Sequence, residues 1–164
     1  MESYSIRVTK DYLVFCTAHF ISYEKTRCER VHGHNYRVTA EVTAPLDENY
    51  LVLDFIEFKR ILREITDELD HHVILPLNNP ILKVEQTEDE VTVRYQDKKR
   101  WVFPREDCML LDIHNTTAEE LAWWVCERVL TELKEGGYVT PDKIAVDVEE
   151  TDGQSARYER VLNR

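Results

Sequence analysis

The chain of 164 residues lacks any apolar run long enough to cross a membrane, and its first ten positions carry charge too early for a signal peptide. We therefore expect a cytoplasmic protein with no membrane contact. Basic residues are also scarce, with 21 Lys and Arg against 32 Asp and Glu and a formal net charge of -11. This balance argues against binding to a nucleic-acid backbone, but a locally basic pocket for a small anionic substrate stays possible.

Cysteine and glycine are equally rare, with four of each. No CxxC pair and no disulfide-framework spacing occurs, so we expect reduced thiols. No GxGxxG stretch occurs either, and we expect no dinucleotide redox cofactor. Cys16 and Cys126 fall in apolar patterns and are expected to pack in the core, and Cys108 has no assigned role. At 43% hydrophobic residues the chain has enough apolar surface for one domain over residues 1–164.

The first third of the chain alternates like strands and then like a helix. Residues 4–20 are predicted to form one strand and residues 34–43 a second, antiparallel to it. From Asp54 the apolar spacing becomes helical and continues to about Asp70. Asp54 is the predicted N-cap, and Glu57 stands three residues later, where it would complete a capping box.

The rest of the chain contains a hairpin signal, a second helix and a terminal strand pair. Two alternating runs, VTVRY and RWVF, predict a β-hairpin within residues 82–105. The second helix begins near Thr116 and ends at a pair of glycines, Gly136 and Gly137. The segments KIAVDVEET and ARYERVLN flank a hairpin-turn dipeptide. With no repeat and no linker, this order predicts a single α+β domain.

Three histidines are candidates for a metal site. His32 and His34 flank Gly33, so both imidazoles lie on one face if this segment is extended. His19, near the end of the preceding strand, would supply a third ligand if the two strands pair. Three histidines with an open fourth position are typical of catalytic zinc. An exposed pair of strand histidines without function is the alternative, and the pattern alone leaves it open.

Two further clusters indicate proton transfer. Asp70 and His71 follow the first helix, where an aspartate can orient and charge an imidazole; capping of the helix C-terminus explains them equally well. Cys28 lies between Arg27 and Arg30, and neighbouring cations favour the thiolate. We therefore interpret Cys28 as a candidate base or nucleophile.

Taken together, these residues resemble the 6-pyruvoyltetrahydropterin synthase / 6-carboxytetrahydropterin synthase family. The matching segments occur in family order between residues 14 and 151: FCTAHF, CERVHGHNYRV, LVLDFIEFK, LDHHVILP, NTTAEELA and VEET. The resemblance implies the tunnelling fold, a four-stranded antiparallel sheet with two helices on one face. It also implies a homo-oligomer, a trimer or hexamer, with the site between subunits. Residues 83–108 then form an inserted β-hairpin relative to compact bacterial members.

The resemblance also assigns roles to ten residues. His19, His32 and His34 would bind zinc; Cys28, Asp70 and His71 would transfer protons; Glu150 would anchor the pterin, with Thr116, Thr117 and Phe55 beside it. A carboxylate suits the anchoring role because it accepts two N–H bonds from a guanidine-like edge. No role follows for His72, His114 or Cys108.

By the same resemblance, the chain is a lyase that acts on 7,8-dihydroneopterin triphosphate. The three residues between Cys28 and His32 are similar to the 6-carboxytetrahydropterin synthases of queuosine biosynthesis, whose reaction releases acetaldehyde and triphosphate. The alternatives are a 6-pyruvoyltetrahydropterin synthase, a non-catalytic pterin- or purine-binding module and a structural zinc protein. Cys28, Asp70 and His71 favour an enzyme, since a module that only binds needs no proton-transfer groups.

Overall fold

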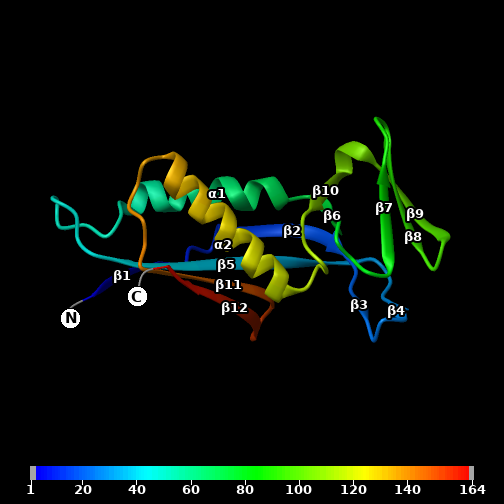
Figure 1. Cartoon of the computed structure of the whole chain (residues 1–164), viewed down its shortest axis with the longest axis horizontal. Helices are drawn as coiled ribbons and strands as arrows, with labels where there is room; N and C mark the ends of the chain where they lie inside the picture. The colour runs from blue at the N-terminus through cyan, green and yellow to red at the C-terminus, as the bar shows by residue number, and fades with distance from the viewer. Residues whose placement is uncertain (1–2, 163–164) are drawn as a thin grey trace.

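The computed structural model describes residues 3–162, so the predicted domain 1–164 extends beyond the described part by two residues at each end. A curved, mixed seven-stranded sheet carries both helices on one face (Figure 1). The sheet consists of β1 (Tyr4–Val8), β2 (Val14–His19), β5 (His32–Ala44), β6 (His72–Pro76), β10 (Cys108–Leu111), β11 (Lys143–Thr151) and β12 (Gln154–Val161). Within residues 3–162, no helix is long and apolar enough to cross a membrane.

The sheet is larger than the resemblance implied. The strands β2, β5, β11 and β12 do form an antiparallel group of four, but β1 pairs with the second half of β5, and β6 and β10 add parallel pairs beside β2. The prediction of four strands, all antiparallel, is therefore wrong. The single strand predicted over residues 4–20 is two strands, with a turn between them in which the N–H of Leu13 donates to the carbonyl of Lys10. The segments of β6 and β10 are short apolar runs without alternation, which periodicity cannot distinguish from a loop or helix end.

The two helices lie close to their predicted positions. Helix α1 (Phe55–Leu69) begins at Asp54, whose side chain accepts a hydrogen bond from the N–H of Ile56 at 2.8 Å. The predicted capping box does not form, because Glu57 instead accepts hydrogen bonds from Arg60 and Tyr138. Helix α2 (Ala118–Glu135) begins at Thr117, whose hydroxyl accepts from the N–H of Glu120, and is followed by Gly136. Apolar faces of both helices contribute to the main core against the sheet.

The predicted hairpin is in fact a separate three-stranded sheet. It consists of β7 (Leu82–Gln86), β8 (Glu90–Tyr95) and β9 (Lys98–Pro104), followed by a 3-10 turn, η1 (Arg105–Asp107). This sheet stands at one end of the molecule, beside the short hairpin of β3 (Ser22–Tyr23) and β4 (Arg27–Cys28) (Figure 1). It encloses a second core with buried Phe20, which directly follows His19 in the chain. The added sheet therefore packs against the segment that carries candidate site residues.

Candidate functional site

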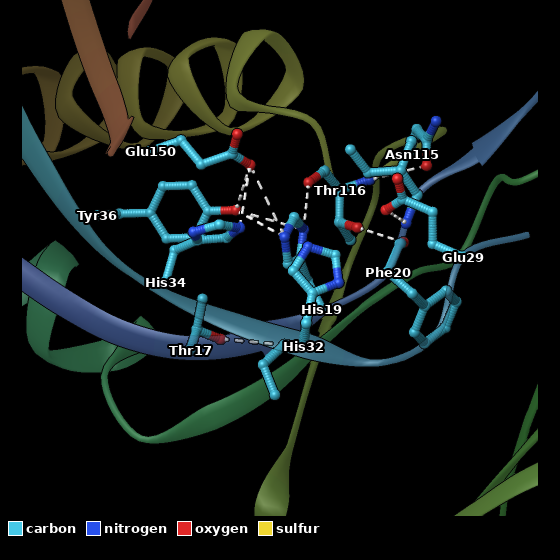
Figure 2. A network of polar contacts seen from close by, with 12 residues as sticks. Thr17, His19, Phe20, Glu29, His32, His34, Tyr36, Asn115, Thr116 and Glu150 are labelled. Atoms are coloured by element: carbon cyan, nitrogen blue, oxygen red, sulfur yellow. Dashed lines mark hydrogen bonds and ion pairs between the residues drawn. The ribbon is translucent and has the colours of Figure 1, made fainter. Parts of the chain in front are cut away.

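The three candidate histidines lie at the adjoining ends of two paired strands. His19 ends β2 and stands directly opposite His32, the first residue of β5; His34 follows on the same face. Their ligand nitrogens all lie within 4.8 Å of one another, and the rings point toward a shared space (Figure 2). Gly33 between them allows the close approach of the two strands, since a Cβ there would lie 3.0 Å from the carbonyl oxygen of Thr17. The predicted convergence of the three imidazoles is present in the structure.

Backbone carbonyls orient two of these imidazoles. The Nδ1 of His19 lies 2.8 Å from the carbonyl oxygen of Thr116, and the Nδ1 of His32 lies 2.9 Å from that of Arg30. Because a carbonyl only accepts, each Nδ1 carries the proton and each Nε2 keeps a lone pair. Burial lowers the pKa of His19, with smaller contributions in the same direction from the two neighbouring histidines, while Thr116 and Glu150 oppose the shift. The neutral imidazole that results is the form that binds metals, so the residues present fit a metal ion.

A tyrosine connects this cluster to Glu150. The hydroxyl of Tyr36 lies 3.1 Å from Nε2 of His19 and donates to Oε1 of Glu150, also at 3.1 Å (Figure 2). The same carboxylate oxygen lies 3.8 Å from Nε2 of His19 and of His34. Burial, and then the Glu150 carboxylate, raises the pKa of Tyr36, so its hydroxyl stays protonated. The sequence reasoning missed Tyr36, although its place two residues after His34 on the same strand face was a usable signal.

Glu150 also borders a pocket of about 340 Å³. The residues that line it are Ile21, Thr117, Ala118, Glu119, Glu150, Gln154, Ser155 and Ala156. Two of the four expected pterin contacts, Glu150 and Thr117, therefore lie together. Thr116 is fully buried, and its hydroxyl donates to the carbonyl of Phe20 at 2.7 Å. Phe55 lies half-exposed at the start of α1, where it lines other pockets, so this single chain does not bring it to Glu150.

Asp70 and His71 form the expected carboxylate–imidazole pair. One oxygen of Asp70 accepts a hydrogen bond from the N–H of Cys16 at 2.7 Å, and the other lies 2.8 Å from Nδ1 of His71. Although burial acts in the opposite direction, these hydrogen bonds lower the pKa of Asp70 and keep it a carboxylate. The His71 side chain is 81% exposed. Within residues 3–162, no hydrogen bond or ion pair connects this pair to the three histidines.

The pKa of Cys28 shifts in the direction opposite to the prediction. Burial raises the pKa of its thiol, Arg100 opposes that shift and Glu29 adds to it, so the expected lowering by Arg27 and Arg30 is wrong. The guanidinium of Arg27 instead pairs with Glu24 at 3.1 Å. Arg100, the cation that does act on Cys28, stands 72 positions further along the chain. No local pattern points to a contact between residues so far apart in the sequence.

A match to a known family identifies the class of pterin-processing enzymes to which this site belongs. The family model of 6-pyruvoyl tetrahydropterin synthase matches residues 7–161. The chain belongs to the 6-pyruvoyl tetrahydropterin synthase family. This confirms the resemblance seen in the sequence.

Named relatives agree with this assignment. A Methanocaldococcus jannaschii protein, provisionally named 6-carboxy-5,6,7,8-tetrahydropterin synthase, is 35% identical over 92% of this chain and 91% of its own length. The 6-carboxy-5,6,7,8-tetrahydropterin synthase of Aquifex aeolicus is 30% identical over 93% of this chain and 89% of its own. The chain is thus a member of a lyase-type enzyme family, and the prediction of an enzyme is confirmed.

A solved structure from Plasmodium vivax has the same fold. It is a 6-pyruvoyltetrahydropterin synthase in which a catalytic glutamate is replaced by alanine; it is 25% identical to this chain, covers 99% of this chain and 100% of its own, and has a TM-score of 0.90. Because the match covers nearly all of the chain, the three-stranded sheet falls inside the matched span.

The geometry of the histidines predicts stoichiometric metal binding. After incubation with zinc and removal of the excess, the protein should retain about one ion per chain. His32→Ala should lose this ion yet stay folded, because His32 lies at the surface rather than in the core. The matched control is His114→Ala, which removes an exposed histidine that lies beside Glu120. Elemental analysis measures the metal content, and an unchanged content in His32→Ala would refute the site.

Proposed function

We propose that this protein is a zinc-dependent 6-carboxytetrahydropterin synthase. It converts 7,8-dihydroneopterin triphosphate and one water into 6-carboxy-5,6,7,8-tetrahydropterin, acetaldehyde and triphosphate. The observation that carries the proposal is the cluster of three converging imidazoles next to a carboxylate that borders a pocket. The names of the relatives from Methanocaldococcus jannaschii and Aquifex aeolicus support the reaction, and by resemblance we place it in queuosine biosynthesis in the cytoplasm.

Zinc is the proposed ion because the donor set is three imidazole nitrogens. Such a set leaves one tetrahedral position open, as in catalytic rather than structural zinc sites. Bound there, zinc would supply a Lewis acid that polarises a side-chain oxygen of the substrate and makes the neighbouring C–H more acidic. The chain itself contributes by fixing His19 and His32 through their Nδ1 atoms, so that little rearrangement accompanies binding.

Glu150 is the proposed anchor of the pterin ring. Its carboxylate reaches the pocket, and two oxygens can accept the amino group and ring N–H of a pterin as a bidentate pair. The hydrogen bond from Tyr36 holds one of these oxygens beside the histidines. Thr117 lines the same pocket from the start of α2, while the buried Thr116 acts on the site through His19. Recognition and metal binding therefore share one connected set of side chains.

Proton transfer is divided between two groups. A thiol with a raised pKa is mainly protonated near neutral pH, so Cys28 can donate a proton directly and accept one only through its thiolate fraction. The Asp70 carboxylate binds Nδ1 of His71, which leaves the exposed imidazole able to exchange protons through Nε2. Glu29 directly follows Cys28 and is a carboxylate whose part in the reaction a substitution can test.

We also propose that the active protein is a homo-oligomer, a trimer or a hexamer. His71 is exposed and unconnected to the histidine cluster, and Phe55 lies away from the Glu150 pocket. A neighbouring subunit would bring such groups to the cluster, and it would cover sheet edges that soluble proteins seldom leave free. The proposed reaction depends on the metal throughout, and the protein needs no nucleic-acid partner for it.

A second candidate reaction is 6-pyruvoyltetrahydropterin synthesis. The Plasmodium vivax structure with a TM-score of 0.90 carries that name, so the fold is compatible with it. The two reactions share the release of triphosphate and differ in the fate of the three-carbon side chain. The gap of three residues between Cys28 and His32 resembles the 6-carboxy branch and makes the first reaction our choice.

Analysis of the products tests the proposed reaction directly. Zinc-loaded protein incubated with 7,8-dihydroneopterin triphosphate should release acetaldehyde and triphosphate in equal amounts, together with 6-carboxytetrahydropterin. Chromatography with mass detection identifies all three. Triphosphate without acetaldehyde would identify the 6-pyruvoyl reaction instead. No turnover by folded, zinc-loaded protein would favour a module that only binds pterins.

Two substitutions distinguish the candidate proton-transfer groups near β4. Cys28→Ala should lower kcat by a factor of about 10² to 10⁴, the usual contribution of a general acid or base. Glu29→Gln should change kcat little, as should the control Glu24→Gln, which alters a glutamate in the same hairpin that pairs with Arg27. Steady-state kinetics gives the comparison. If Glu29→Gln shows the large loss and Cys28→Ala does not, the roles are reversed.

A further inference from the structure

The hairpin that carries Cys28 is too small to hold its own position. Its strands β3 and β4 pair through only Ser22–Cys28 and Tyr23–Arg27. Two residues of its turn, Glu24 and Lys25, have positive φ angles of 52° and 57°. A two-stranded hairpin is marginally stable at best in water, and this one is much shorter than most. The place of Cys28 must therefore be set by contacts from outside the hairpin.

Different parts of the chain hold the two strands. Ser22 on β3 is fixed by Asn115, whose side chain accepts from its N–H at 3.2 Å and donates to its carbonyl at 2.8 Å, and by Asn79, which donates to its hydroxyl. On the β4 side, Nη2 of Arg100 donates to the carbonyl of Cys28 at 3.1 Å and to that of Glu29 at 3.0 Å. The β4 side is thus held by the three-stranded sheet as well as by Ile21, whose carbonyl accepts from the N–H of Glu29 at 2.9 Å.

Aromatic residues of that sheet fix the Arg100 side chain. Its guanidinium carbon lies 4.5 Å from the ring centre of Trp101 and 5.2 Å from that of Tyr95. Trp101 in turn stacks on Phe20 with 4.2 Å between ring centres, and the Tyr95 hydroxyl donates to the carbonyl of Thr26. The sheet therefore contacts the chain before, within and after the hairpin, and Arg100 is its contact with the segment that carries the thiol.

We propose that Arg100 is a positioning residue for the reaction, which fixes Cys28 and Glu29, in the segment that leads to His32, by binding both of their carbonyl oxygens. The inference rests on the proposed function, because it takes Cys28 as a participant in the chemistry. Among residues 3–162, no hydrogen bond or ion pair joins Arg100 to the three histidines, and Arg100 does not line the Glu150 pocket, so its proposed action is through the segment it holds. The three-stranded sheet then has a function in the site, as the support of Arg100.

The charge of Arg100 also affects the thiol of Cys28. Two charged groups affect the thiol of Cys28: Arg100 from β9 favours the thiolate, and Glu29 beside it in the chain disfavours it, while burial raises the pKa most strongly. The nearby Arg27 is turned toward Glu24. Removal of Arg100 should therefore both release the carbonyls of Cys28 and Glu29 and shift the titration of the thiol to higher pH.

Three variants separate these effects from general damage to the sheet. Arg100→Met keeps a long stem but loses the donor and the charge. Arg100→Lys keeps the charge, and a single ammonium nitrogen can donate twice, as the single Nη2 does. Arg94→Met is the matched control, because Arg94 lies on the neighbouring strand β8 and pairs with Glu85 within the same sheet. It should behave as the unmodified protein.

Two readouts are measured on the full-length, zinc-loaded protein. With 7,8-dihydroneopterin triphosphate, Arg100→Met should lower kcat by about 10- to 100-fold with little change in KM, as expected when a reacting group is misplaced. The rate of iodoacetamide alkylation of Cys28, followed against pH by peptide mass spectrometry that resolves it from the exposed Cys16, should shift to higher pH. Arg100→Lys should restore both properties in large part.

The outcomes are distinguishable. A folded Arg100→Met variant with unchanged kcat and alkylation profile overturns the proposal, and so does an equal loss in Arg94→Met. If Arg100→Met does not fold, Arg100→Gln against Arg100→Lys makes the same comparison, with equal alkylation profiles counting against the proposal. If even the unmodified protein shows no turnover, the proposed function fails, while the alkylation profiles still decide whether Arg100 controls Cys28.

Discussion

The pairing register of β2 with β5 is the constraint on which the site depends. It places His19 directly opposite His32 and sends His34 to the same face. A slip of one residue would turn one strand's histidines to the opposite face and destroy the cluster. The two strands approach closely at this point, because a Cβ at Gly33 would lie 3.0 Å from the carbonyl oxygen of Thr17 and would push the backbone of β2 aside. The metal geometry is thus a property of backbone pairing before any side chain is oriented.

Neighbouring elements then convert this placement into a chemical site. The segment before α2 supplies the carbonyl of Thr116 that orients His19, and β11 supplies Glu150. Tyr36, a buried member of the main core, joins His19 to Glu150 through its hydroxyl. Partners of this kind fix the tautomer and the orientation of metal ligands, so packing of the helix on the sheet and the affinity for metal are coupled. The three-stranded sheet supplies the remaining support, on the side of Cys28.

Local sequence patterns correctly predicted those structural features that depend on residues close together in the chain. The alternation through His32 and His34, the N-cap at Asp54 and the terminal hairpin at Gly153 all appear in the structure. Parts that depend on distant contacts were not predictable: the parallel strands β6 and β10 carry no alternating pattern, and nothing near Arg100 in the sequence indicates Cys28 as its partner. The direction of the Cys28 pKa was mispredicted because burial outweighs the effect of nearby cations.

In the proposed site the three histidines hold the metal, and Cys28 stays outside its coordination shell. X-ray absorption spectroscopy of the zinc-loaded protein measures this directly, since it separates sulfur from nitrogen and oxygen donors by distance. We expect only nitrogen and oxygen donors at about 2.0–2.2 Å, with the outer scattering typical of imidazole. A sulfur donor at about 2.3 Å would contradict it, because Cys28 would then be a ligand rather than a proton-transfer group.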